Sequence, residues 1–147
     1  MIGAQLRVAA EAVHQAVYDR LAHAGHHHLR QSHLALLKFP GPHGARPTEL
    51  AARVGLRKQA LNPLLNELEQ LGYLQRTSDD EDRRGRIVWL TPRGMSLMRI
   101  MRETLEEVES QLSDRLGAAG LEDFQVALSL VGEIAREVAD APEALSS

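Results

Sequence analysis

The feature that most constrains the fold is a pair of short helical patterns separated by a glycine, within residues 46–72. Thr48 is placed to cap the first helix, because its hydroxyl can accept a hydrogen bond from a backbone N–H of the first turn. Gly55 is placed to end that helix. A second helix is expected from about 58 to 71, and its inward side carries Leu61, Leu64, Leu65 and Leu68. Two short helices joined by a turn that contains glycine predict a helix-turn-helix.

The residues that follow favour a β-hairpin. Segments 73–76 and 87–90 are rich in β-prone residues, and the polar segment 77–85 between them is longer than a tight turn. The hairpin should therefore project as a wing. A further short helix is expected before the helix-turn-helix, over about 30–39. The predicted fold class is mainly α with a small β-hairpin wing: a winged helix-turn-helix flanked by dimerisation helices.

Helical periodicity also marks both ends of the chain. It predicts one amphipathic helix over 4–24, another that begins at Pro92, and a last one after a break at 117–120. The apolar stripes are Leu6, Ala9, Val13, Val17 and Leu21 in the first, Met98, Met101, Leu105, Val108 and Leu112 in the second, and Phe124, Leu128, Val131, Ile134 and Val138 in the third. A monomer of this size would struggle to cover all of them, so we predict a twofold homodimer. Packing of these helices within one chain is the alternative.

These patterns describe one subunit rather than several domains. In it, residues 1–28 and 95–147 are expected to form dimerisation helices, and residues 30–94 the winged helix-turn-helix region. No apolar run approaches the roughly 20 residues of a membrane span, and charged residues interrupt the first 17 residues, which argues against a signal peptide. A cytoplasmic protein with no membrane partner is expected. Cysteine is absent, which excludes disulfides and thiolate metal ligands.

The charge is unevenly distributed. The whole chain has a net charge of −3, which would argue against a nucleic-acid partner. Residues 1–102, however, contain 15 basic and 9 acidic side chains, whereas residues 103–147 contain 2 and 11. The chain therefore combines a basic body with an acidic end, and this asymmetry is itself a sign of a charged partner for the body.

The polar face of the helix-turn-helix provides the strongest chemical signal. The chain has no glycine-rich phosphate loop, no H-E-x-x-H and no G-x-S-x-G, so no enzyme activity and no cofactor are expected. Arginine, lysine, asparagine and glutamine contact phosphates and base edges, and the inward leucines force them outward here. A solvated polar face is the alternative. The candidate DNA contacts are Arg46, Thr48, Arg57, Lys58, Gln59, Asn62 and Asn66.

The predicted wing adds a second set of charged residues. Arg83, Arg84 and Arg86 lie beside four acidic residues at 79–82, so the loop charge nearly cancels. One interpretation is that an aspartate holds an arginine ready to enter a narrow minor groove. The other is a solvated turn with surface salt bridges of little consequence.

The segment 46–94, RPTELAARVGLRKQALNPLLNELEQLGYLQRTSDDEDRRGRIVWLTPRG, resembles the winged-helix core of the MarR family of bacterial transcription regulators. The resemblance extends over about Leu34–Leu116. It is most specific at Asp82-Arg83-Arg84, followed by Leu90-Thr91 and Gly94. It implies that Arg84 enters the minor groove, that Asp82 positions it, and that the helix 57–71 reads the major groove.

The resemblance also implies a dimer built from the terminal helices. Such a dimer would bind a double-stranded, pseudo-palindromic operator, usually as a repressor that a small-molecule effector releases. The sequence departs from the family pattern at two positions. Arg57 stands where a serine or threonine cap is common, which forgoes about 1 kcal/mol of helix stability, and Pro63 lies inside the recognition helix, where it should bend the helix.

Five of the seven histidines fall between residues 23 and 33. His23 and His27 are four residues apart and could hold a metal ion from one helix face. The MarR resemblance places the stretch near an effector pocket, for which His28 and His33 are the candidates. Solvated or hydrogen-bonded histidines are the prevailing alternative, and no metal site is predicted. The competing function is a winged-helix module that senses metal or binds protein and does not read DNA.

Overall fold

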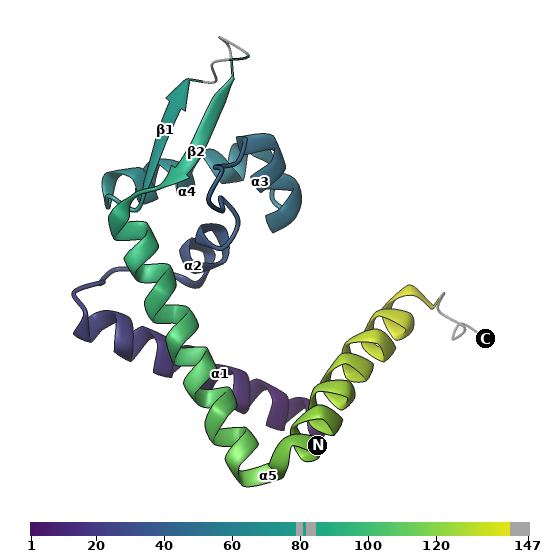
Figure 1. Cartoon of the computed structure of the whole chain (residues 1–147). Coiled ribbons are helices and arrows are strands. Elements are labelled where there is room, and N and C mark those ends of the chain that lie inside the picture. The colour runs from purple at the N-terminus through teal and green to yellow at the C-terminus, as the bar shows by residue number, and fades with distance from the viewer. Residues whose placement is uncertain (79–80, 82–84, 142–147) are drawn as a thin grey trace. The chain divides into compact units, whose positions relative to one another are not determined.

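The computed structural model describes residues 1–78, 81 and 85–141 (Figure 1). Its elements follow the predicted order of helices and hairpin. They are α1 (Ile2–His23), α2 (Gln31–Leu37), α3 (Pro47–Val54), α4 (Lys58–Gln70), β1 (Leu74–Ser78), β2 (Arg86–Leu90) and α5 (Pro92–Asp140). The chain divides into two compact units, Met1–Leu105 and Glu106–Ser147. The mainly helical fold with one two-stranded antiparallel hairpin confirms the predicted fold class.

The first unit has a core built from helix leucines. The inward residues of α2, α3 and α4 meet the base of the hairpin and the beginning of α5. The largest fully buried side chains are Leu21, Leu36, Leu37, Leu50, Leu61, Leu65, Leu68, Tyr73, Val88 and Leu97. Each such leucine contributes roughly 1.5–3 kcal/mol by leaving water. This burial fixes which face of α4 points outward.

Helix α3 begins two residues earlier than predicted. Its N-cap is Arg46, and Thr48 lies inside the first turn, so the prediction that Thr48 caps this helix is wrong. Pro47 explains the difference, because proline has no N–H to leave unpaired and its fixed φ suits the first helical position. The carboxylate of Glu49 then accepts a hydrogen bond from the Arg46 backbone N–H at 3.2 Å. Gly55 ends α3 in the left-handed conformation, as predicted.

Helix α4 begins after Arg57, whose backbone is extended and whose side chain makes no cap hydrogen bond. The departure from a serine or threonine cap therefore has the predicted structural consequence. The helix continues through Pro63 to Gln70, and Pro63 itself is exposed.

The wing is an antiparallel hairpin whose register runs from Leu74 opposite Leu90 to Ser78 opposite Arg86. The loop before α3 joins its edge. Ala45 and Val88 exchange two backbone hydrogen bonds, at 3.0 and 2.8 Å. The base of the wing is thereby anchored to the helix-turn-helix.

Thr91 connects the wing to α5. Its backbone N–H donates to the Tyr73 carbonyl at 3.0 Å, and its hydroxyl donates to the Gly72 carbonyl at 2.5 Å. The same hydroxyl oxygen accepts from the Gly94 N–H at 3.1 Å, which caps α5. One threonine thus links the end of α4, the start of β1 and the first turn of α5.

Apolar residues remain exposed on the terminal helices. In α1, only Val17 and Leu21 are buried. Helix α5 changes direction at Gly117, where φ is 76° and ψ is 164°, close to the predicted break. The exposed large apolar residues of the described chain include Ile2, Val8, Leu105, Val108, Phe124, Val126, Leu128, Leu130, Ile134 and Val138. None of the described helices combines the length and apolar character that crossing a membrane requires.

Candidate nucleic-acid interface

The outward face of α4 carries the polar side chains that the sequence singled out. Leu61, Leu65 and Leu68 are buried. The candidate contacts Arg57, Lys58, Gln59, Asn62 and Asn66 are all exposed. Helix α4 has no acidic residue in its first turn. Its N-terminal end, where unpaired backbone N–H groups already favour anions, therefore also carries two cations.

Two of the remaining candidates lie at the start of α3, which packs against α4, and the others belong to the wing. Arg46 and Thr48 are exposed at the start of α3. Figure 1 shows α3 and α4 at the base of the hairpin, on the same side of the first unit as the wing. Arg86 is exposed at the first position of β2. Asp82, Arg83 and Arg84, the predicted wing-tip contacts, lie outside the described residues.

Asn66 has a partner within the chain. Its Oδ1 accepts a hydrogen bond from Nη2 of Arg76 on β1, at 2.5 Å. The same guanidinium donates from Nε and Nη2 to one oxygen of Glu69, at 2.9 and 2.7 Å. Sequence reasoning missed Arg76. The available signal was strand periodicity, because Arg76 lies two residues after the buried Leu74 and so shares its face.

A second polar cluster joins α2 to α4. His33 is 2% exposed. Its Nδ1 accepts from the Arg30 backbone N–H at 3.1 Å, so its Nε2 carries the proton and donates to Glu67 at 2.7 Å. The Arg30 guanidinium bonds the same carboxylate oxygen. The hydrogen bond from His33, followed by the hydrogen bond and charge of Arg30, lowers the pKa of Glu67 below its ordinary value.

This cluster gives His33 a structural role that the sequence did not reveal. Both ring nitrogens are engaged with residues of the chain itself. His28 is exposed and has a positive φ of 62°. The assignment of His28 and His33 to an effector pocket stays a prediction.

A third polar cluster lies where α1, the wing and α5 approach one another. The Tyr73 hydroxyl is 3.0 Å from His26 Nδ1 and accepts from Arg93 Nη2 at 3.2 Å. The guanidinium carbon of Arg93 also lies 4.8 Å from the centre of the Tyr73 ring, a cation–π contact. Burial first, and then the charges of Arg93 and His27, lowers the pKa of His26. Sequence reasoning treated His26 only as one more histidine of the cluster.

The other histidines do not gather into a metal site among the residues that the structure describes. No three histidine, aspartate or glutamate side chains there lie close enough to hold an ion. His23 is bonded through Nδ1 to the Asp19 carbonyl at 2.6 Å, and the ring of His27 packs edge-on against that of His28.

Comparison with known proteins identifies the winged-helix region. A MarR family model matches residues 30–85. No curated protein sequence matches the chain. Solved structures do. A transcriptional regulator from Thermotoga maritima is 25% identical, with 95% of this chain and 98% of the other aligned at a TM-score of 0.60.

Two further similar structures contain DNA. The repressor CouR, bound to a 23-mer DNA duplex, is 24% identical, with 92% of each chain aligned and a TM-score of 0.66. A mutant of MepR from S. aureus, bound to an oligodeoxyribonucleotide, is 19% identical over 92% of this chain and 97% of its own, with a TM-score of 0.62. The Thermotoga maritima protein and CouR are transcription regulators, in agreement with the expectation that the chain is not an enzyme. Residues 30–85, most of the winged-helix region, therefore match the MarR family of transcription regulators in sequence, and the chain shares its fold with the transcriptional regulator from Thermotoga maritima.

Proposed function

We propose that this chain is a homodimeric, DNA-binding transcription regulator that reads a pseudo-palindromic operator. The observation that carries the proposal is the exposed polar N-terminal half of α4, held outward by three buried leucines. Two similar structures, CouR and the MepR mutant, were determined with DNA, which supports the same partner for this chain.

The side chains of α4 suit the edges of bases in the major groove. Arginine and lysine bond the two acceptors of guanine, and asparagine and glutamine bond adenine through an acceptor and a donor. Arg57 and Lys58 at the start of α4 would contact guanine or bind phosphates. Gln59 and Asn62 would contact adenine. The wing would add a minor-groove contact through Arg84, positioned by Asp82. Acting on DNA also places the protein in the cytoplasm.

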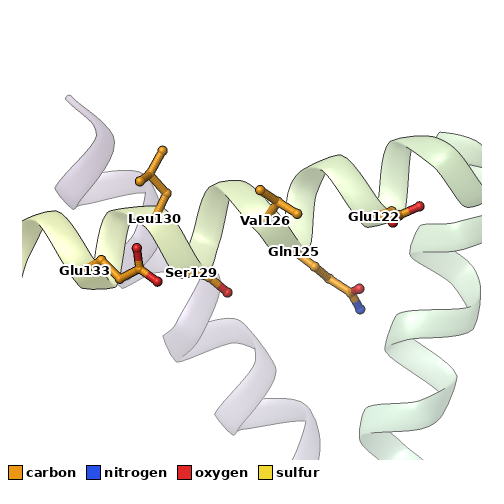
Figure 2. Close-up of a pocket in the computed structure, with 6 residues that line it drawn as sticks. All are labelled: Glu122, Gln125, Val126, Ser129, Leu130 and Glu133. Carbon is orange, nitrogen blue, oxygen red and sulfur yellow. The ribbon is translucent and has the colours of Figure 1, made fainter.

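Homodimerisation would cover the apolar surfaces of the terminal helices. The first half of α1 exposes Ile2 and Val8. In the second unit, a shallow groove lies on the helix after Gly117, and Figure 2 draws the residues that line it: Glu122, Gln125, Val126, Ser129, Leu130 and Glu133. Val126 and Leu130 are 63% and 51% exposed in it. Exposed apolar groups at this density favour a partner surface, and a second copy is the common solution.

Such a dimer would place two recognition helices in successive major grooves, with half-sites about 34–36 Å apart. We further propose that binding represses transcription and that a small-molecule effector relieves the repression, near His28 and His33. Sedimentation equilibrium tests the dimer, and a monomer at micromolar concentration would contradict it.

Gel shifts with the DNA upstream of the protein's own gene test operator recognition. Gln59→Ala should weaken binding by about ten- to a hundredfold, as expected for the loss of one base contact. Gln70→Ala is the matched control, because it removes an exposed glutamine from the other end of the same helix. Affinity should also fall steeply with salt if phosphates are contacted. Equal losses in the two variants, or no preference over unrelated DNA, would refute the proposal.

A further inference from the structure

Arg76 connects the wing to the recognition helix through side chains. It lies in the middle of β1, opposite Val88 of β2, and its side chain is 22% exposed. From there its guanidinium reaches two residues of α4, Asn66 and Glu69, with three hydrogen bonds of 2.5–2.9 Å. Residues three apart on a helix share one face, so the two contacts lie one above the other along α4.

The guanidinium of Arg76 is well suited to fix the angle between the hairpin and α4. Its donors form a rigid planar fork, so two acceptors on one helix face hold the arginine plane in a single orientation. The strand behind it is also held, because Val88 is buried and is paired with Ala45 on its other side. The contact with α4 therefore constrains the direction in which the hairpin leaves the helix-turn-helix.

We propose that Arg76 is a positioning residue for DNA recognition: it holds the wing at the angle to α4 that lets the two elements enter neighbouring grooves together. This inference rests on the proposed DNA binding. It gives Asn66 a different role from the DNA contact that the sequence suggested. Its Oδ1 holds Arg76 in place, whereas the base contacts belong to the residues of the first turns of α4.

The contact is poorly suited to a merely stabilising role. Glu69 is 38% exposed and Arg76 is 22% exposed, and ion pairs that water reaches add little to folding stability. Loss of the arginine should therefore leave the fold in place and release the wing. A loose wing has to be ordered again when DNA binds, and affinity falls for that reason.

The test compares Arg76→Ala with Arg99→Ala. Arg99 makes an exposed ion pair with Glu103 on α5, so the control removes the same charge and a similar pair away from the wing. Dimethyl sulfate footprinting on the operator reports both grooves, because guanine N7 lies in the major groove and adenine N3 in the minor groove. Circular dichroism and thermal unfolding monitor the fold.

Arg76→Ala should bind the operator about ten- to a hundredfold more weakly, with little change in the unfolding midpoint. At protein concentrations that restore full guanine N7 protection, protection of adenine N3 should remain reduced. Arg76→Lys should recover part of the affinity, because it restores the charge but not the fork. If Arg76→Ala does not fold, Glu69→Gln weakens the same contact and should shift the footprint in the same direction.

The inference is overturned if Arg76→Ala matches Arg99→Ala in affinity and footprint. It is also overturned if the two grooves lose protection in parallel at equal occupancy, since that indicates a general loss of binding. A wild-type chain that gives no footprint at all refutes the proposed function, and this inference with it. A wild-type footprint that the substitution leaves unchanged refutes the positioning role alone.

Discussion

Replacing Gly94 by alanine should destabilise the fold, although the substitution adds only one carbon. It is buried in the first turn of α5, with its α-carbon against the carbonyl of Tyr73. A β-carbon there would lie well inside the van der Waals distance of the Tyr73 oxygen, and 3.1 Å from Cδ2 of Leu90. The Tyr73 oxygen cannot easily move away, because it accepts the Thr91 N–H that connects the wing to α5.

The magnitude follows from two opposing effects. Alanine is favoured over glycine inside a helix by up to about 1 kcal/mol. Forcing an extra carbon into a packed site costs about 1–3 kcal/mol, and the high end applies when the neighbour is backbone. We therefore expect Gly94→Ala to lower the free energy of unfolding by about 2 kcal/mol. For a chain of this length, that corresponds to a fall in Tm of about 4–8 °C.

Thermal and urea unfolding, followed by circular dichroism at one fixed protein concentration, measure this loss. The fixed concentration matters because the stability of the proposed dimer would depend on it. Gly3→Ala is the matched control: Gly3 is also in a first helical turn, but no atom lies within 4 Å of the place that an added β-carbon would occupy. The control should be neutral or slightly stabilising. Equal stability of the two variants would refute the packing argument at Gly94.

Three further changes test the polar contacts and caps. Arg57→Ser should add about 1 kcal/mol to the free energy of unfolding by capping α4, while gel shifts should show weaker operator binding. If urea unfolding shows an unchanged or lowered free energy of unfolding, the cap argument is contradicted. Because the pKa of His26 is lowered in the folded state from 6.5, the unfolded chain takes up the proton first, so stability should fall as the pH drops through about 6.5 and level off below the folded pKa. His26→Gln should flatten that part of the pH profile of urea midpoints, and an unaltered slope would show that another group is responsible. His33→Ala should raise the pKa of Glu67 towards its ordinary value in a carboxyl NMR titration, and an unmoved titration would leave Arg30 as the sole cause.

The order of elements could be predicted because its signals are local. Leucine spacing marks the inward side of α4, and glycine ends α3 in a left-handed conformation that other residues adopt at a cost. The error at Thr48 has the same local origin. Two adjacent residues offered competing start signals, and Pro47 at the first helical position outweighed the Thr48 hydroxyl, which could have capped the helix two residues later.

The polar clusters could not be predicted in the same way. His33 and Glu67 are 34 residues apart, and His26 and Tyr73 are 47 apart. Helical or strand periodicity shows which side of an element is inward, but not which inward group on another element it will meet. For Arg76, periodicity indicates a half-buried arginine on the Leu74 face, yet the two acceptors on α4 follow only from how the hairpin packs.

The contacts within the first unit also explain how a chain of net charge −3 can present a cationic surface. The acidic residues of α4 are Glu67 and Glu69, and both lie in its second half, bonded to Arg30, His33 and Arg76. The charges of these two glutamates are thus offset by partners in the same chain. Arg57 and Lys58, in contrast, are exposed at the opposite end of α4, which is the positive end of the helix dipole. Of the 20 acidic side chains in the sequence, 10 belong to the unit after Leu105, which contains only two arginines. A phosphate approaching the first turn of α4 therefore meets exposed cations and the positive end of the helix dipole, and Arg57→Ala should reduce the salt dependence of DNA binding because one phosphate contact is lost.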